Sequence, residues 1–162
     1  MCQCALGGYY AEGEHNLQML DTSRLDHHLL YEYHMSRFWL YMFCDQYSSN
    51  QSLKPAYRQK MKESLMAALN LADRQSPEYL YLLGQMYAII RNDQKMAFRV
   101  RSNLIGKLPV KSKLYASTAY DLAWYYKSQA NEEKYVEWCC RAAIADMLTP
   151  LKENLAIQDL AM

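Results

Sequence analysis

Residues 114–147, LYASTAYDLAWYYKSQANEEKYVEWCCRAAIADM, decide the fold of this chain. Their first half carries Ala119, Leu122 and Tyr126 at the spacing of one helical face. A short polar turn follows and ends at Asn131, whose two following glutamates are typical of a helix start. The stretch therefore predicts two antiparallel helices joined by a tight turn.

The second predicted helix makes this hairpin apolar on one side. It carries Tyr135, Val136, Cys139 and Ala142. Small side chains at Ala123 and Ala142 allow the two helices to approach closely. A hairpin with one apolar side cannot bury that side alone, so we expect neighbouring hairpins of the same kind.

Composition favours one helical domain. The chain has 162 residues, 51% of them hydrophobic, with only five glycines and four prolines to interrupt helices. A net charge of +1 gives no global field for nucleic acid or a membrane surface. No apolar run reaches the roughly 18–20 residues that span a bilayer, and the opening residues lack a signal-peptide pattern. Five cysteines, an odd count, are read as apolar filler rather than as a disulfide framework.

The rest of the chain repeats the helical pattern. Ser76-Pro77 is a strong helix start, and Thr149-Pro150 ends the hairpin described above. We expect an all-α fold: a right-handed α-solenoid of about four antiparallel hairpins, truncated at both ends, in a single domain over 1–162. The expected hairpins cover approximately 1–21, 25–73, 77–106 and 112–147, with the start of a further helix over 149–162.

An internal repeat supports this architecture. Leu82–Tyr87 (LLGQMY) aligns with Asp121–Tyr126 (DLAWYY), and Asn92–Ile105 aligns with Asn131–Ile144, both at an offset of 39 residues. The helix–turn–helix unit itself is about 34 residues long, which is the tetratricopeptide period.

The aligned units resemble the tetratricopeptide repeat (TPR) family. The family's large-then-small pair falls on Leu83-Gly84 and Leu122-Ala123. One departure is that the second helix has Met96 and Tyr135 where the family usually has alanine, which implies wider helix spacing.

A closer resemblance covers the C-terminal half. The run KYVEWCCRAAIADMLTPLKENLAIQDLA is similar to the divergent TPR region of bacterial membrane-linked transcriptional regulators. In that group an often exported TPR region precedes a membrane segment and a cytoplasmic DNA-binding portion. The resemblance implies a sensory or partner-binding region in the periplasm, whereas free cysteines suit the cytoplasm.

The first helix of each hairpin lines the concave face of such solenoids, so we expect a ligand groove on that face. When the repeats are aligned, a tyrosine occupies the same position of the first helix in each. One helical turn later, each first helix carries a larger polar or aromatic side chain on the same face. The groove candidates are Tyr33, Arg37, Tyr81, Gln85, Tyr120 and Trp124. Such a row suits an extended peptide or an inserted helix. The alternative is that these rings only pack against the neighbouring hairpin.

Residues 91–113 are rich in cations, with Asp93 as their single acid. The predicted basic patch comprises Arg91, Lys95, Arg99, Arg101 and Lys107, followed by Lys111 and Lys113. It would suit an acidic partner or phosphates, although a solvated helix face is the commoner explanation. Nucleic-acid binding through this stretch is the weakest of the three functions considered, and none is expected.

Motifs for catalysis, metal binding and cofactor binding are not found in the sequence. His27 and His34 share a helix face but lie seven residues apart, whereas zinc usually takes histidines at i and i+4. No phosphate loop, nucleophile elbow or zinc-protease motif occurs. We therefore expect no enzyme activity, no metal and no cofactor.

The sequence supports two functions that differ in kind. The first is a protein- or peptide-binding module within a larger regulator. The second is a structural spacer or self-association scaffold, including a homodimer, without a dedicated groove. An open aromatic row favours the first, and burial of that row in a symmetric dimer favours the second.

Overall fold

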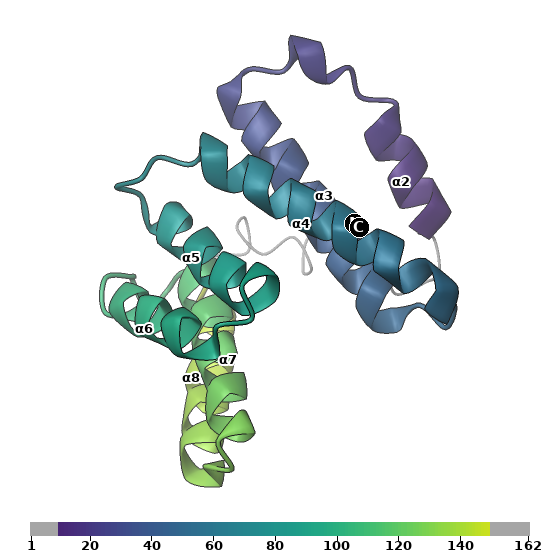
Figure 1. The fold of residues 1–162 in the computed structure, drawn as a ribbon. Coiled ribbons are helices and arrows are strands. Elements are labelled where there is room, and N and C mark those ends of the chain that lie inside the picture. The colour runs from purple at the N-terminus through teal and green to yellow at the C-terminus, as the bar shows by residue number, and fades with distance from the viewer. Residues whose placement is uncertain (1–9, 150–162) are drawn as a thin grey trace. The chain divides into compact units, whose positions relative to one another are not determined.

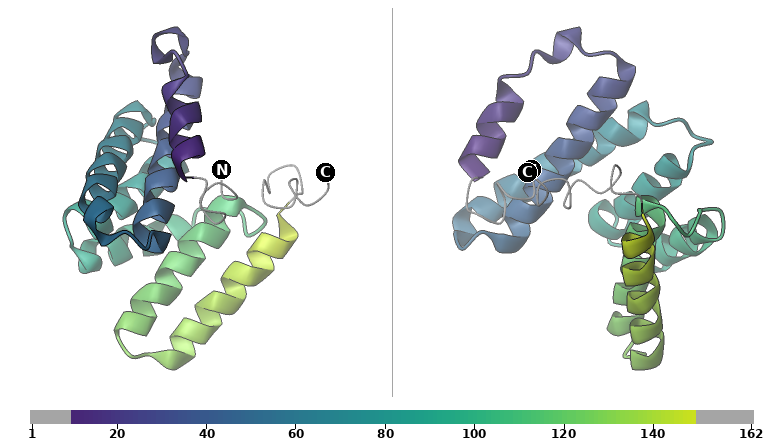
Figure 2. Two further views of the ribbon diagram at one scale, coloured as in Figure 1. Left: turned by 90° about the vertical axis from the view of Figure 1, so that its right-hand side faces the viewer. Right: turned by 180° about the vertical axis from the view of Figure 1, so that it is seen from behind.

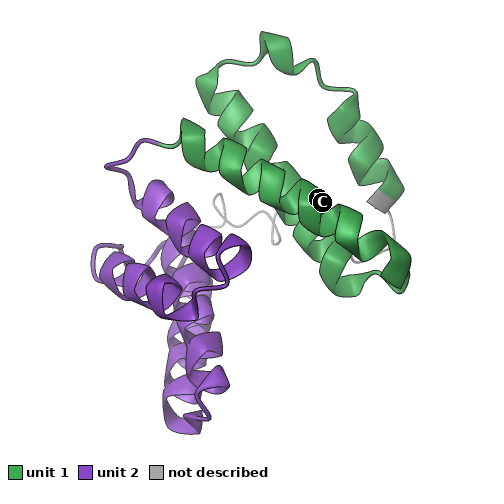
Figure 3. Ribbon diagram, viewed as in Figure 1, with its two compact units in different colours: residues 1–72 green, residues 73–162 purple. Residues whose placement is uncertain are grey.

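The computed structural model describes residues 10–149, and within that range it contains helices and turns but no strand (Figure 1). The chain divides into two compact units, residues 1–72 and 73–162 (Figure 3). The described helices of unit 1 are α2 (Tyr10–Gln18), η1 (Thr22–Arg24), α3 (His27–Tyr47), η2 (Gln51–Leu53) and α4 (Lys54–Leu71). Those of unit 2 are α5 (Pro77–Gln85), the π-turn η3 (Met86–Ile90), α6 (Gln94–Ile105), α7 (Lys113–Ser128) and α8 (Glu132–Leu148).

Unit 1 is built on the α3–α4 hairpin. Asp26 caps α3 by accepting a hydrogen bond from the Leu29 amide at 2.8 Å, and a proline occupies the first turn of α4. The interior of the hairpin is mostly apolar and contains Phe38, Leu40, Cys44, Leu65 and Ala68, with Ser64 as a buried polar residue. Burial raises the pKa of the Cys44 thiol to about 11, so this cysteine is an inert core residue.

Helix α2 is tied to this hairpin through one carboxylate. Glu14 accepts a hydrogen bond from the Tyr41 hydroxyl at 2.8 Å and also pairs with the ammonium of Lys60. The Lys60 hydrogen bond holds the pKa of Glu14 below its usual value, with Tyr41 acting in the same direction. Glu14 therefore connects α2 to both α3 and α4.

Unit 2 contains the two hairpins that the repeat predicts, and Figure 2 shows α7 and α8 running antiparallel. The predicted cap at Ser76 accepts from the Tyr79 amide at 3.1 Å, and the predicted cap at Asn131 accepts from the Lys134 amide at 3.0 Å. The small residues of the α7–α8 contact are buried as expected, because Ala123 is fully enclosed and Ala142 is 7% exposed.

The π-turn η3 changes the alignment of the first hairpin with the second. A π-turn accommodates an extra residue between the two helices of the hairpin. The buried face of α6 is consequently Ala97, Arg101 and Leu104, one residue beyond the positions that the constant offset assigned. The small residue expected early in the second helix is therefore Ala97, which is fully buried, and the assignment of Met96 to that position was wrong.

The fold is an all-α helical repeat, as the sequence predicted. No helix between residues 10 and 149 is long and apolar enough to cross a membrane. The predictions for residues 1–9 and for the further helix after Pro150 lie outside the described residues. A single domain over 1–162 stays a prediction.

Candidate functional site

The groove candidates of unit 1 are half-buried side chains on α3. The Tyr33 ring meets His34 edge to face, with ring centroids 5.1 Å apart. The Arg37 guanidinium lies 5.5 Å from the centroid of the Tyr41 ring and 3.9 Å from a carboxylate oxygen of Glu63. Arg37 is thus held between an aromatic face and an acid of α4.

The α5 candidates of unit 2 lie in its interior. Tyr81 is 4% exposed and Gln85 is 6% exposed, so neither presents an open surface. The Gln85 amide donates to Oδ2 of Asp121 on α7 at 2.6 Å, and its carbonyl accepts from Nη2 of Arg101 on α6 at 3.3 Å. Gln85 therefore links α6 to α7 through one hydrogen bond to each helix.

Gln85, Arg101 and Asp121 form a buried polar triad, with one residue from each of α5, α6 and α7. Nη2 of Arg101 lies 3.3 Å from Oδ2 of Asp121, while no described residue offers a partner to Nε of Arg101. Burial raises the pKa of Asp121, and the charge of Arg101 and the hydrogen bond from Gln85 act against that rise. Gly84 leaves room for the arginine, since a Cβ there would stand 3.2 Å from Cγ of Arg101.

The α7 candidates are exposed and adjacent. Tyr120 is 51% exposed and Trp124 is 46% exposed, and their rings meet edge to face with centroids 6.1 Å apart. Tyr135 of α8 supports Trp124 from the other side at 6.2 Å. Nζ of Lys127 lies 4.5 Å from the Trp124 ring centroid and 5.0 Å from that of Tyr135. The aromatic groups are therefore exposed to solvent yet fixed by their neighbours.

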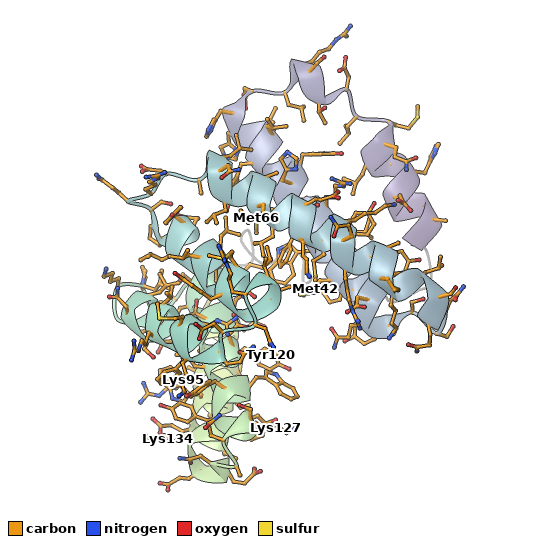
Figure 4. The ribbon with its side chains drawn as sticks, viewed as in Figure 1. Met42, Met66, Lys95, Tyr120, Lys127 and Lys134 are labelled. Atoms are coloured by element: carbon orange, nitrogen blue, oxygen red, sulfur yellow. The ribbon has the colours of Figure 1, made fainter. Side chains whose placement is uncertain are left out.

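These residues belong to a single line along α7, which we call the α7 seam: Lys113, Ser117, Tyr120, Trp124 and Lys127. Their alternating spacing of four and three residues keeps them on one face of the helix. In Figure 4, Tyr120 and Lys127 lie toward one side of the unit, and Lys95 and Lys134 lie toward the other. The α7 seam carries a cation at each end, aromatic rings in the middle and no acid.

Sequence reasoning identified Tyr120 and Trp124 and missed Lys127 and Tyr135. The seven-residue step from Tyr120 to Lys127 was a usable signal, because it marks the same helix face. Tyr135 comes from the other helix, so its contact with Trp124 depends on how the hairpin closes.

The predicted basic patch is divided by the structure. Arg91, Lys95, Arg99 and Lys107 are exposed. Arg101 is only 7% exposed and directs its guanidinium to Asp121. Four of the five cations are thus available to a surface partner, and the fifth belongs to the interior of unit 2.

The histidine-rich start of α3 forms no cluster of potential metal ligands with other described residues. His34 has a buried Nδ1 without a hydrogen-bond partner among residues 10–149, and burial lowers the pKa of its imidazole. A half-buried ring against Tyr33 is consistent with a packing role.

Comparison with known proteins gives one family. A family model described as the SusR N-terminal TPR domain matches residues 2–162, which is nearly the whole chain. Neither the curated proteins nor the solved structures that were compared contain a match.

Proposed function

This chain belongs to the SusR N-terminal TPR domain family, and from that membership we propose a non-enzymatic module that binds a protein or peptide on the α7 seam. TPR domains are generally protein-interaction modules. The observation that carries the proposal is the exposure of Tyr120 and Trp124 on rings that are already held in place.

Held aromatic rings suit binding for an energetic reason. Tyrosine and tryptophan supply large contact areas, and both are enriched among the residues that dominate binding free energies. The ordering of a side chain on binding costs roughly 0.5–1.5 kcal/mol, and a ring already fixed by neighbours avoids much of that cost. Tyr135 and Lys127 fix the Trp124 ring in this way.

The other groove candidates have distinct parts in this proposal. Gln85 and Tyr81 act from the interior, where Gln85 fixes the position of α7 through Asp121. Tyr33 and Arg37 are candidates for a separate contact on unit 1. The family is described as an N-terminal domain, and the resemblance of the C-terminal half to bacterial regulators leads us to propose that this chain is the partner-binding region of a larger regulator.

The test is a pull-down from extract of the native cells with three purified baits. These are the native chain, a Tyr120→Ala/Trp124→Ala variant and a Val136→Ala/Ile144→Ala control, which changes exposed apolar side chains of α8 in the same hairpin. We expect a specific partner that binds the native and control baits and is lost from the seam variant. Equal recovery of every protein on the native and seam-variant baits, at equal helicity, would refute the proposal.

A scaffold that associates with a second copy is the other candidate function, and α8 favours it. Val136, Ile144 and Met147 are 55%, 54% and 83% exposed, and they share one face of the helix. Two copies of this face would bury their apolar side chains against each other. Sedimentation velocity distinguishes the candidates, because a dimer that Val136→Ala/Ile144→Ala dissociates would support the scaffold.

A further inference from the structure

We infer that the segment bound by the α7 seam is acidic at both ends and apolar between them. This inference rests on the proposed function and names the chemistry of the partner. It follows from the composition of the seam. A positive charge lies at each end, on Lys113 and Lys127, and only Ser117 and two aromatic rings lie between them.

The seam lysines lack carboxylate partners within the described part of the chain. The Lys113 ammonium is exposed and forms no ion pair there, and the Lys127 ammonium lies over the faces of Trp124 and Tyr135. The single acid of α7, Asp121, is turned inward to Arg101 and Gln85. A ligand carboxylate would therefore meet an available ammonium group at each end of the seam.

None of the four acids of α8, which are Glu132, Glu133, Glu137 and Asp146, forms an ion pair with Lys113 or Lys127. Glu137 is paired with Lys134 and Arg141, both at 2.7 Å. Glu132 and Glu133 occupy the first turn of α8, where the positive end of the helix dipole attracts carboxylates. Neither of them forms an ion pair with Lys127. The seam thus keeps its positive ends although the helix beside it is acidic at its start.

The spacing of the lysines fixes the length of the ligand. Lys113 and Lys127 are about four turns apart, so their Cα atoms are separated by roughly 21 Å at 1.5 Å per residue. An extended segment spans that distance with about six or seven residues, at close to 3.3 Å each. A helical segment needs about 14 residues. Two acids six or seven positions apart in an extended ligand should therefore flank about five or six apolar positions.

The charges and the rings have different effects on binding. Apolar contact with Tyr120 and Trp124 supplies affinity regardless of salt. The two exposed lysines supply selection among apolar segments and a salt-sensitive part of the affinity, because exposed ion pairs are screened above about 0.1 M salt. A neutral apolar peptide would bind the rings but gain nothing from the ends of the seam.

The experiment selects ligands without assuming their sequence. A phage library of random 16-residue peptides is panned on the native chain at 50 mM salt and depleted on the Tyr120→Ala/Trp124→Ala variant. We expect the surviving peptides to carry Asp or Glu on both sides of an apolar or aromatic run. Survivors without acidic enrichment would overturn this inference and leave the proposed function standing. A selection without any peptide that distinguishes the two baits would overturn both.

A direct measurement then locates the charges. One selected peptide, made with a fluorescein label, is titrated with the native chain and with Lys113→Gln, followed by fluorescence anisotropy. We expect Lys113→Gln to weaken binding roughly three- to fivefold at 50 mM salt, and the difference to shrink strongly at 500 mM.

The matched control changes the same charge elsewhere. Lys95→Gln alters an exposed lysine of α6 that is not part of the seam, and we expect unchanged affinity. An equal loss for Lys95→Gln and Lys113→Gln would mean that net charge, rather than the seam, attracts the peptide, and would refute the inference. Lys113 is preferred to Lys127 because removal of Lys127 also disturbs Trp124.

Discussion

The buried ion pair between Arg101 and Asp121 allows a quantitative test of how α5, α6 and α7 are held together. Asp121→Ala removes the carboxylate and leaves the Arg101 guanidinium, 7% exposed, with the Gln85 carbonyl at 3.3 Å and no described partner for Nε. Breaking a buried pair by removing one partner costs roughly 3–5 kcal/mol. The Asp121 side chain is 24% exposed, so we expect the lower end, about 3 kcal/mol in the free energy of unfolding of unit 2.

The reciprocal variant should depend on pH. Arg101→Met removes the charge that opposes the raised pKa of Asp121, so that pKa rises further. The folded state then holds the Asp121 proton more tightly than the unfolded state does. Stability is accordingly greater below the unfolded pKa and is lost as pH rises through the folded pKa. The deficit of Arg101→Met relative to the native chain should be smaller at pH 5 than at pH 8.

The double variant tests whether Arg101 and Asp121 stabilise the fold as a pair or independently. In Arg101→Met/Asp121→Leu both charges are replaced by apolar groups of similar size, a change that is often neutral or stabilising. Gln85 loses both of its side-chain partners in this variant, which costs about 1–3 kcal/mol. We therefore expect the double variant to be less stable than the native chain by about that amount, well below the sum of the two single-variant losses, which is a coupling of several kcal/mol between the two sites. The assay is urea unfolding followed by far-ultraviolet circular dichroism, with hydrogen exchange of α5–α7 amides to localise the effect. Single-variant losses that simply add in the double variant would refute the reasoning.

Three further predictions concern other parts of the chain. Ala130 has a left-handed φ of 55° in the α7–α8 turn, so Ala130→Gly should relieve strain and raise the free energy of unfolding by up to about 1 kcal/mol; a loss of stability in urea melts would contradict this. Glu14 has a lowered pKa, so its contribution to α2 docking should be present above the unfolded carboxyl pKa, about 4.5, and be lost as pH falls through the folded pKa. The protection of α2 amides, measured relative to their intrinsic exchange rates, should therefore fall below that pH in the native chain and show no such step in Glu14→Gln. Cys44 has a pKa of about 11 and a buried sulfur, so it should react with iodoacetamide only on unfolding, whereas the exposed Cys140 should react in the folded chain. The reaction of the native chain is followed over time by mass spectrometry, and equal rates at the two cysteines would disprove the packing described for α3.

Most of the secondary structure could be predicted from local sequence signals. Ser76 and Asn131 were recognisable as caps because their side chains satisfy amides of the following turn, a purely local interaction. The repeat between the two hairpins of unit 2 led to the TPR family, which the family match confirms. Helical period and capping depend on neighbours within a few residues, so they can be read from the chain alone.

The candidate site was less accessible from the sequence. A constant offset of 39 residues placed Tyr81 and Gln85 in the same environments as Tyr120 and Trp124. The structure gives them different environments, because the face of α5 that carries Tyr81 and Gln85 is buried while one face of α7 stays open. Exposure depends on which helices cover which faces, and that is a property of the packed unit.

The sequence by itself determined the helices, their caps and the repeated hairpin, because each follows from short-range hydrogen bonds and apolar periodicity. Only the tertiary structure decided which residues face outward. The π-turn η3 moved the buried face of α6 by one residue, so Arg101 entered the interior as the partner of Asp121 instead of joining a basic surface. The closing of α8 on α7 brought Tyr135 to Trp124 and fixed the aromatic seam. These outcomes depend on contacts between helices, whose geometry a constant residue offset does not contain.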